Sequence, residues 1–435
     1  MTISNNRILA KGKEISNDTH STRLNNNDLI IGATGTGKTT GYVIPNMLRM
    51  NSSMVVADTK GNLCKKLSPI LKKNGFKVDV LDFMDPDGVS CYNPLDYIRF
   101  DENTEKHKEQ DIMTIANSII PDTVCKNDTF WPSTARTLLA CLISYVLEAF
   151  DPEDRNLPAV SDVFKVACEQ YDAAPSSEKS VKFLDEWSVL HPDSFAARKY
   201  RMFKGVMNSD KTWACIQQFV SNALDIFDYE NARKLFAANG DFRISDLGKR
   251  KSVLFLNISD TDHSLDKVIN VFYSQAFQVL CSDADSKPSG RLDVPVRIIL
   301  DDFATNVNIA DFDKLISVIR SREISVSIIL QSISQLETLY SKPAALTIMN
   351  GCDHILYLGG NDLDTASFIS SKVFKTVENV MCLPNEKAYL ITRGEKGELV
   401  DKVIPDFTQT SENTFNGYSV PNYSTEELRT ERERC

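Results

Sequence analysis

The sequence lacks closely spaced cysteines and has few histidines. Its ten cysteines are scattered over 435 residues with no C-x-x-C spacing, and its five histidines are dispersed. A zinc site or a disulfide framework needs such residues at short, regular spacings. The cysteines are therefore interpreted as reduced cytosolic thiols, and no transition-metal site is expected.

Long hydrophobic runs are also missing. The best candidate, Thr137–Phe150, is too short to cross a bilayer, follows Arg136 and contains Glu148, so it is expected to be a buried helix. The first residues, MTISNNRILAKGKE, have no apolar core of the kind found in secretory signals. A cytoplasmic protein is predicted, which reaches a membrane only through a partner.

Basic residues are fewer than acidic residues. The chain has 49 basic and 59 acidic residues and a formal charge of −10. This balance opposes an extended nucleic-acid surface but leaves room for a local one, because a few cations facing a channel suffice. The candidate basic clusters are 198–201 with Lys204, and 249–251. For each cluster, a solvated charged face explains the residues at least as well as DNA contact does.

A glycine-rich loop, GATGTGKTT at residues 32–40, directly follows the apolar run Asp28–Ile31. Its glycines permit a tight turn whose N–H groups can cradle phosphates, and a helix is expected to begin near Gly37. Lys38 can reach the outer phosphates and Thr39 can ligate Mg²⁺, as in the motif G-x-x-x-x-G-K-[ST]. The sequence therefore predicts bound ATP and Mg²⁺. The predicted nucleotide-binding residues are Gly32, Ala33, Thr34, Gly35, Thr36, Gly37, Lys38, Thr39 and Thr40.

Short apolar strands alternate with helical segments on both sides of a long stretch without strand signal. The further strands are predicted at Met54–Ala57, Val78–Leu81, Val253–Ile258, Val296–Leu300, Val326–Leu330 and Ile355–Leu358. Residues 101–247 are charged, helical in period and interrupted by prolines. The prediction is an α/β P-loop NTPase domain with a mostly parallel sheet, formed by 1–100 and 248–405. An all-α domain is inserted at 101–247, and 406–435 form a polar, flexible tail.

Two carboxylates follow the predicted strand Val296–Leu300. Ligands in open α/β sheets bind at the carboxyl ends of the strands, which is where Asp301 and Asp302 are expected. Asp301 is predicted to hold Mg²⁺ and Asp302 to orient or deprotonate the attacking water. A pair of solvated turn acids is the alternative. An acid in the second position favours hydrolysis over transfer to a metabolite.

Several segments together resemble the TraG/TraD-type coupling proteins of conjugation and type IV secretion. They are IGATGTGKTTGYVIPN, VVADTKG, CYNPLDYI, LDDFATNVNIADFDKLISVIRSREISVSIILQSISQLE and MNGCDHILYLGG. The resemblance covers about residues 20–405, and its most specific part is 300–337. It implies a RecA-like ATPase with an inserted all-helical domain. The implied protein is a DNA translocase, active as a hexameric ring, that recruits a relaxase-bound single DNA strand and passes it to a secretion channel.

The resemblance also assigns three residues. Asp301 matches the Mg²⁺-site aspartate, Arg320 the arginine that reaches a neighbouring subunit's nucleotide, and Gln331 the glutamine that senses the γ-phosphate. Lys38, Asp302, Arg320 and Gln331 are thus the predicted catalytic residues. A surface salt bridge is the other explanation for Arg320, and Arg322 competes for its role.

The chain departs from the family pattern in two ways. Asp302 stands where members usually have glutamate, and the membrane-spanning helices of many relatives are missing from the sequence. Either hydrolysis is slower, or the loop that carries Asp302 lies closer to the nucleotide. Either the chain is a membrane-free member of the group, or another protein anchors it at the inner face of the cell membrane. Two alternatives stay open, an FtsK/HerA-like pump that moves DNA inside the cell and a weakly hydrolysing nucleotide-gated switch.

Overall fold

The computed structural model describes 5–59, 61–85, 90–121, 129–175, 179–237, 240, 242–259, 261–301, 308–404, 414–415 and 418–419. The chain divides into two compact units. Unit 1 consists of Met1–Val80, Arg243–Thr261 and Phe277–Cys435, and unit 2 of Leu81–Phe242 and Asp262–Ala276. The domain limits predicted from the sequence, 1–100 with 248–405, 101–247 and 406–435, stay a prediction. No helix among the described residues is long and apolar enough to cross a bilayer.

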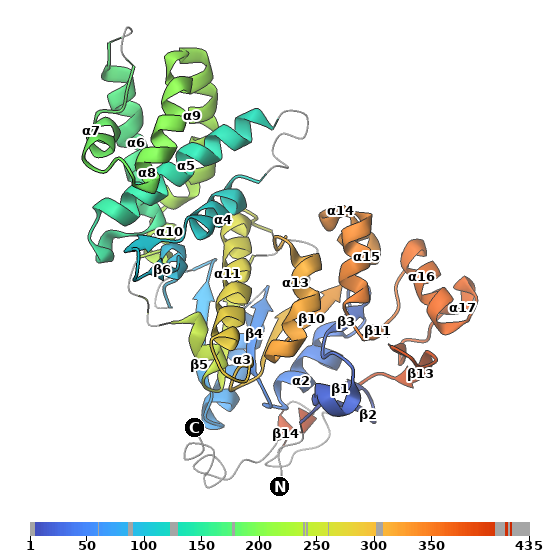
Figure 1. Ribbon diagram of the computed structural model, residues 1–435. Helices are drawn as coiled ribbons and strands as arrows, with labels where there is room; N and C mark the ends of the chain where they lie inside the picture. The colour runs from blue at the N-terminus through green and yellow to red at the C-terminus, as the bar shows by residue number, and fades with distance from the viewer. Residues whose placement is uncertain are drawn as a thin grey trace. The chain divides into compact units, whose positions relative to one another are not determined.

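A nine-stranded sheet organises unit 1 and is parallel from β11 through β8 (Figure 1). Its order is β13 (Glu398–Asp401), β12 (Lys387–Thr392), β11 (His354–Tyr357), β3 (Asp28–Ile31), β10 (Ile324–Leu330), β9 (Val296–Leu300), β4 (Ser53–Asp58), β8 (Ser252–Asn257) and β5 (Lys77–Asp82). β3, β4, β8 and β9 are buried along their whole length, which explains their continuous β-branched and aliphatic sequences. The α/β sheet expected from the sequence is confirmed.

The other elements of unit 1 connect or flank these strands. They are β1 (Asn6–Ala10), β2 (Lys13–Ser16), α1 (Thr19–Thr22), the π-helical turn η1 (Thr39–Val43), α2 (Ile44–Met47), α3 (Asn62–Lys73), η7 (Ile244–Gly248), α13 (Phe312–Val318), η8 (Ile319–Arg322), α14 (Ile333–Tyr340), α15 (Lys342–Asn350), α16 (Leu363–Val373) and α17 (Val377–Met381). The two-residue strands β14 (Thr414–Phe415) and β15 (Tyr418–Ser419) pair with each other. α11 (Asp266–Asp285) contributes residues to both units.

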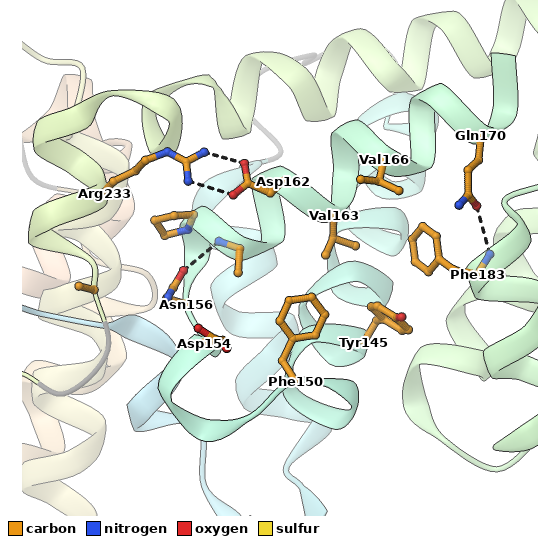
Figure 2. Close-up of a pocket in the computed structure, with 13 residues that line it drawn as sticks. Tyr145, Phe150, Asp154, Asn156, Asp162, Val163, Val166, Gln170, Phe183 and Arg233 are labelled. Atoms are coloured by element: carbon orange, nitrogen blue, oxygen red, sulfur yellow. Dashed lines mark hydrogen bonds and ion pairs between the residues drawn. The ribbon is translucent and has the colours of Figure 1, made fainter. Parts of the chain in front are cut away.

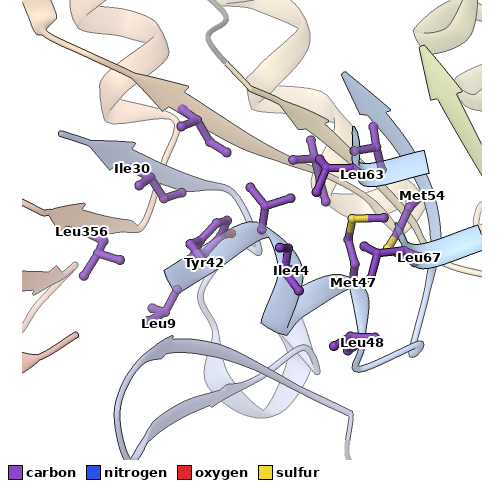
Figure 3. Packing of buried hydrophobic residues seen from close by; sticks show 14 of the residues in the cluster. Leu9, Ile30, Tyr42, Ile44, Met47, Leu48, Met54, Leu63, Leu67 and Leu356 are labelled. Atoms are coloured by element: carbon purple, nitrogen blue, oxygen red, sulfur yellow. The ribbon is translucent and has the colours of Figure 1, made fainter. Parts of the chain in front are cut away.

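The core beneath the phosphate loop is formed by β3, the helix that follows it and neighbouring strands (Figure 3). Tyr42, Val43 and Met47 are fully buried on this helix, and Ile30 and Leu356 lie in the same cluster. Burying such side chains contributes about 1.5–3 kcal/mol each. The strand before the loop and the helix after it are therefore fixed by buried packing.

A buried ionic cluster fixes the start of β3. Asp28 accepts hydrogen bonds from Arg7 Nε at 3.0 and 2.9 Å, from Arg297 at 3.2 Å and from Tyr42 Oη at 2.6 Å. Burial alone would raise the pKa of Asp28, but Arg7 and Arg297 hold it below its usual value. Because Arg7 belongs to β1, Tyr42 to η1 and Arg297 to β9, the cluster ties three segments to the strand that enters the loop.

Unit 2 is mainly helical. Its helices are α4 (Glu109–Ile119), α5 (Phe130–Ala149), α6 (Leu157–Ala173), α7 (Lys182–Leu190), α8 (Phe195–Lys204), α9 (Asp210–Leu224) and α10 (Glu230–Leu235). The short turn η2 (Pro94–Tyr97) precedes α4, and η4 (Pro152–Asp154), η5 (Gly205–Asn208) and η6 (Asp225–Asp228) lie between the later helices. α5 packs against α4, α6, α8 and α9, so its apolar sequence is that of a central buried helix. β6 (Phe100–Asp101) and β7 (Lys106–His107) form a small antiparallel hairpin, which the sequence did not predict.

Candidate active site at the phosphate loop

The phosphate loop leaves the sheet at the end of β3. Gly32 N donates to Leu330 O of β10 at 3.0 Å, and Ala33 N donates to Gly359 O at 2.9 Å. Gly35 and Gly37 have φ angles of +81° and +91°, which strain any other residue. The predicted glycines thus occupy positions where the backbone turns back on itself.

Lys38 is held by carbonyl groups at the start of its own loop. Its ammonium donates to Gly32 O at 2.9 Å and lies 3.5 Å from Ala33 O. The side chain is buried, with 8% of its surface exposed. The ammonium therefore lies inside the loop, where an anion that enters the loop can reach it.

Thr39 and Asp301 meet at the first turn after the loop. Thr39 Oγ1 donates to Asp301 Oδ2 at 3.0 Å, which joins the loop to the end of β9. A hydroxyl and a carboxylate are hard oxygen ligands of the kind that Mg²⁺ prefers, and Mg²⁺ usually completes its shell with phosphate oxygens and water. The two side chains therefore fit the predicted metal.

β10 separates the two other predicted residues. Gln331 directly follows its last residue, and Leu330 pairs with Ile31, so Gln331 lies at the same edge as the loop. Arg320, in η8, precedes the strand and lies at the opposite edge. A strand of seven residues spans about 23 Å. Arg320 is thus remote from the phosphate loop of its own chain.

The contacts of the two candidate arginines differ. Arg322 is engaged by Asp285, with Nε and Nη2 at 2.8 and 2.9 Å from its oxygens. Arg320 donates to the backbone carbonyl of Thr19 at 3.2 Å, and in the described part of the chain it has no carboxylate partner. Pairing with Asp285 leaves Arg322 less suited to a catalytic role than Arg320. Asp302, the predicted water-activating acid, lies outside the described residues.

Lys402 contacts the phosphate loop and was not found by sequence reasoning. It follows β13 and donates to Thr36 O at 3.2 Å and to Leu358 O at 2.7 Å. Burial lowers the pKa of this amine. A cavity of about 130 Å³ adjoins it, lined in part by Gly35, Gly37, Gly41 and Asn385. Because Lys402 acts on backbone carbonyls, no motif marks it.

The predicted basic clusters are largely engaged by protein groups. In the first, Arg198 pairs with Glu109, Lys204 with Asp185, and Arg201 donates to Pro192 O at 2.7 Å. In the second, Arg250 pairs with Asp246. These contacts favour a solvated charged face over a DNA surface at both clusters.

Comparison with known proteins identifies the family. The family described as Type IV secretory system Conjugative DNA transfer matches residues 4–382. The chain belongs to this conjugative DNA transfer family. The TraG/TraD-type resemblance is thereby confirmed.

Curated relatives of the conjugative DNA transfer family include conjugal transfer proteins TraG. That of Rhizobium radiobacter is 25% identical over 364 residues, or 81% of this chain and 53% of the relative. That of Agrobacterium fabrum is 24% identical over 364 residues, or 81% and 51%. The chain thus spans about half the length of these relatives.

Solved structures agree on the fold. The bacterial conjugative coupling protein TrwBdeltaN70 aligns with a TM-score of 0.66 at 17% identity, covering 95% of this chain and 91% of the solved chain. TrwB in complex with ADP and Mg²⁺ aligns with a TM-score of 0.65 at 18% identity, covering 95% and 92%. VirB4 of Thermoanaerobacter pseudethanolicus aligns with a TM-score of 0.56 at 12% identity, covering 92% and 97%. The RecA-like α/β fold with a helical domain is confirmed.

Proposed function

We propose that this protein binds ATP with Mg²⁺ at the phosphate loop and hydrolyses it to move DNA during conjugation. The observation that carries the proposal is the arrangement of Lys38, Thr39 and Asp301 in a chain of the conjugative DNA transfer family. TrwB structures that hold an ATP analogue, or ADP with Mg²⁺, support the choice of ligand. A DNA-translocating motor uses this hydrolysis to do work.

Each residue has a distinct role in the proposed reaction. Backbone N–H groups of 37–40 would surround the phosphates, and Lys38 would exchange its loop carbonyls for phosphate oxygens. Thr39 and Asp301 would hold Mg²⁺, which neutralises charge that develops on the phosphates. Asp302 would take the proton of the attacking water, and Gln331 would contact the γ-phosphate from the end of β10.

Arg320 would complete the site of a second copy of the chain. Its place at the edge of the sheet opposite the loop supports action between subunits, because it is too far away to serve its own nucleotide. A guanidinium without a carboxylate partner in the described structure is suited to stabilising transition-state charge. We propose that the active form is a ring, of six chains by resemblance to the coupling proteins.

The proposed partners follow from the family. The ring would receive relaxase-bound single-stranded DNA and deliver it to the secretion channel at the inner face of the cell membrane, held there by partner proteins. The test is conjugal transfer from donor cells in which Lys38→Ala replaces the natural chain. Loss of transfer with normal protein level supports the proposal, and undiminished transfer contradicts it. An intracellular DNA pump would leave transfer intact, and a nucleotide-gated switch would not hydrolyse ATP.

A further inference from the structure

A cavity of about 650 Å³ opens among the helices of unit 2 (Figure 2). It is lined by residues from α5, the η4 turn, α6, α7 and α10. The volume is large enough for one or two bulky side chains of another molecule. It belongs to unit 2, whereas the phosphate loop belongs to unit 1.

The wall of this cavity is mostly apolar. Tyr145 contacts Phe183 with ring centroids 4.9 Å apart and Phe150 at 6.1 Å. Val163 and Val166 of α6 line the same space, and Val166 is 44% exposed (Figure 2). Packed aromatic rings beside an open apolar space are typical of surfaces that receive an apolar anchor from a partner.

The charge left over at the cavity is negative. Arg233 donates to both oxygens of Asp162, at 2.9 and 2.6 Å, and to Asp228 at 3.2 Å, so its charge is compensated. Asp154 also lines the cavity and is exposed. In the part of the chain that the structure describes, its carboxylate has no ion pair or hydrogen bond. Asp154 is therefore an available partner for a cation.

The sequence around the cavity also has a negative net charge. Residues 101–247 contain 24 acidic and 16 basic residues, a difference of −8, out of −10 for the whole chain. Such a field attracts basic partners and repels the phosphates of nucleic acids. An arginine or lysine beside aromatic rings can in addition interact with their faces.

We propose that this cavity docks a basic, apolar segment of a partner protein. One aromatic or large aliphatic side chain of the segment fills the space between Phe150, Phe183 and Val166. An adjacent arginine or lysine pairs with Asp154. Docking needs no hydrolysis at the phosphate loop, so this inference and the proposed function can fail separately.

The experiment selects ligands from a display library of random 12-residue peptides on the full wild-type chain. The peptide most enriched is then synthesised, and its affinity is measured by fluorescence anisotropy for the wild type and four variants. Asp154→Lys and Val166→Gln alter the cavity. Asp151→Lys, in the same turn, and Val189→Gln, which is 80% exposed on α7, are matched controls outside it. Circular dichroism verifies that every variant is folded.

Selected peptides are expected to carry arginine or lysine next to an aromatic or aliphatic residue. Each cavity variant is expected to weaken binding by tenfold or more, and each control by less than twofold. Equal losses in cavity and control variants would show diffuse charge attraction and overturn the proposal. It is also overturned if selection yields no peptide sensitive to Val166→Gln, if acidic peptides are enriched, or if a single-stranded oligonucleotide displaces the peptide.

Discussion

The Thr39 hydroxyl donates a 3.0 Å hydrogen bond to the Asp301 carboxylate, which joins the phosphate loop to the end of β9. Two oxygen ligands, one from the turn after the loop and one from the residue after β9, are thus brought together before any metal binds. Thr39 and Asp301 are therefore the two residues whose replacement tests the metal site. Replacing either ligand should affect the metal-dependent reaction more than folding.

Asp301→Asn is expected to lower ATP turnover on the order of 10²-fold or more, because a bound metal stabilises the transition state by several kcal/mol. Nucleotide binding without Mg²⁺ should change little. The measurement is turnover against Mg²⁺ concentration, with Asp313→Asn on α13 as the matched control. A wild-type Mg²⁺ dependence in Asp301→Asn would remove this residue from the metal site.

Lys402→Met is expected to weaken nucleotide binding about tenfold, because two hydrogen bonds that join Thr36 of the loop to Leu358, the residue after β11, are lost. The maximal rate at saturating ATP should fall much less. Titration with a fluorescent ATP analogue measures the affinity. Lys387→Met removes the same charge from the neighbouring strand, where Lys387 pairs with Asp401, and should have no effect. Equal losses in both variants would assign the effect to charge alone.

The stability of unit 1 should fall in mild acid because of His354. Burial is the main cause that lowers the pKa of this histidine to about 4. The folded state thus favours the neutral ring, which contributes stability above the unfolded pKa near 6.5 that is lost as pH falls toward 4. The loss is up to about 3 kcal/mol for a shift of this size.

Chemical denaturation from pH 7 to 4 measures this loss. His354→Gln should flatten the pH dependence, and His20→Gln, at an exposed histidine, should leave it unchanged. The same slope in the wild type and His354→Gln would attribute the acid sensitivity to other groups.

Arg320→Ala is expected to retain ATP affinity but lose on the order of 10³-fold in turnover, as for other arginine fingers. Arg322→Ala, which breaks the pair with Asp285, is the matched control and should stay active. Mixing Arg320→Ala with Lys38→Ala should restore part of the activity, because one chain supplies an intact loop and the other an intact arginine. No recovery in mixed rings shown to form would assign Arg320 to its own subunit or to structure.

The sequence was sufficient for the central strands and for the phosphate loop, because a buried parallel strand reads as a continuous apolar run and the loop needs glycine at fixed places. The sequence also predicted that Asp301 lies near the loop, since the carboxyl ends of parallel strands meet at one edge of the sheet. The antiparallel strands β12 and β13 were missed, as was the β1–β2 hairpin. β2 and β13 expose part of their residues and carry weaker patterns. β12 is buried over five of its six residues, so exposure does not explain why it was missed.

Lys402 and Arg320 show a different limit of the sequence. Lys402 binds carbonyls contributed by distant segments, which only the folded chain brings together. Arg320 was predicted by resemblance, but its place at the edge opposite the loop follows from the direction of β10. Asp302 and its role in activating water stay a prediction.

ATP turnover by the purified protein, measured with no DNA, with single-stranded DNA and with double-stranded DNA, decides whether the phosphate loop powers a DNA motor. Lys38→Ala serves as the blank that excludes contaminating ATPases. We expect Mg²⁺-dependent turnover that rises with protein concentration and with DNA, and no turnover in Lys38→Ala. Turnover that is absent under all conditions, or equal in Lys38→Ala, would contradict a motor powered at this loop.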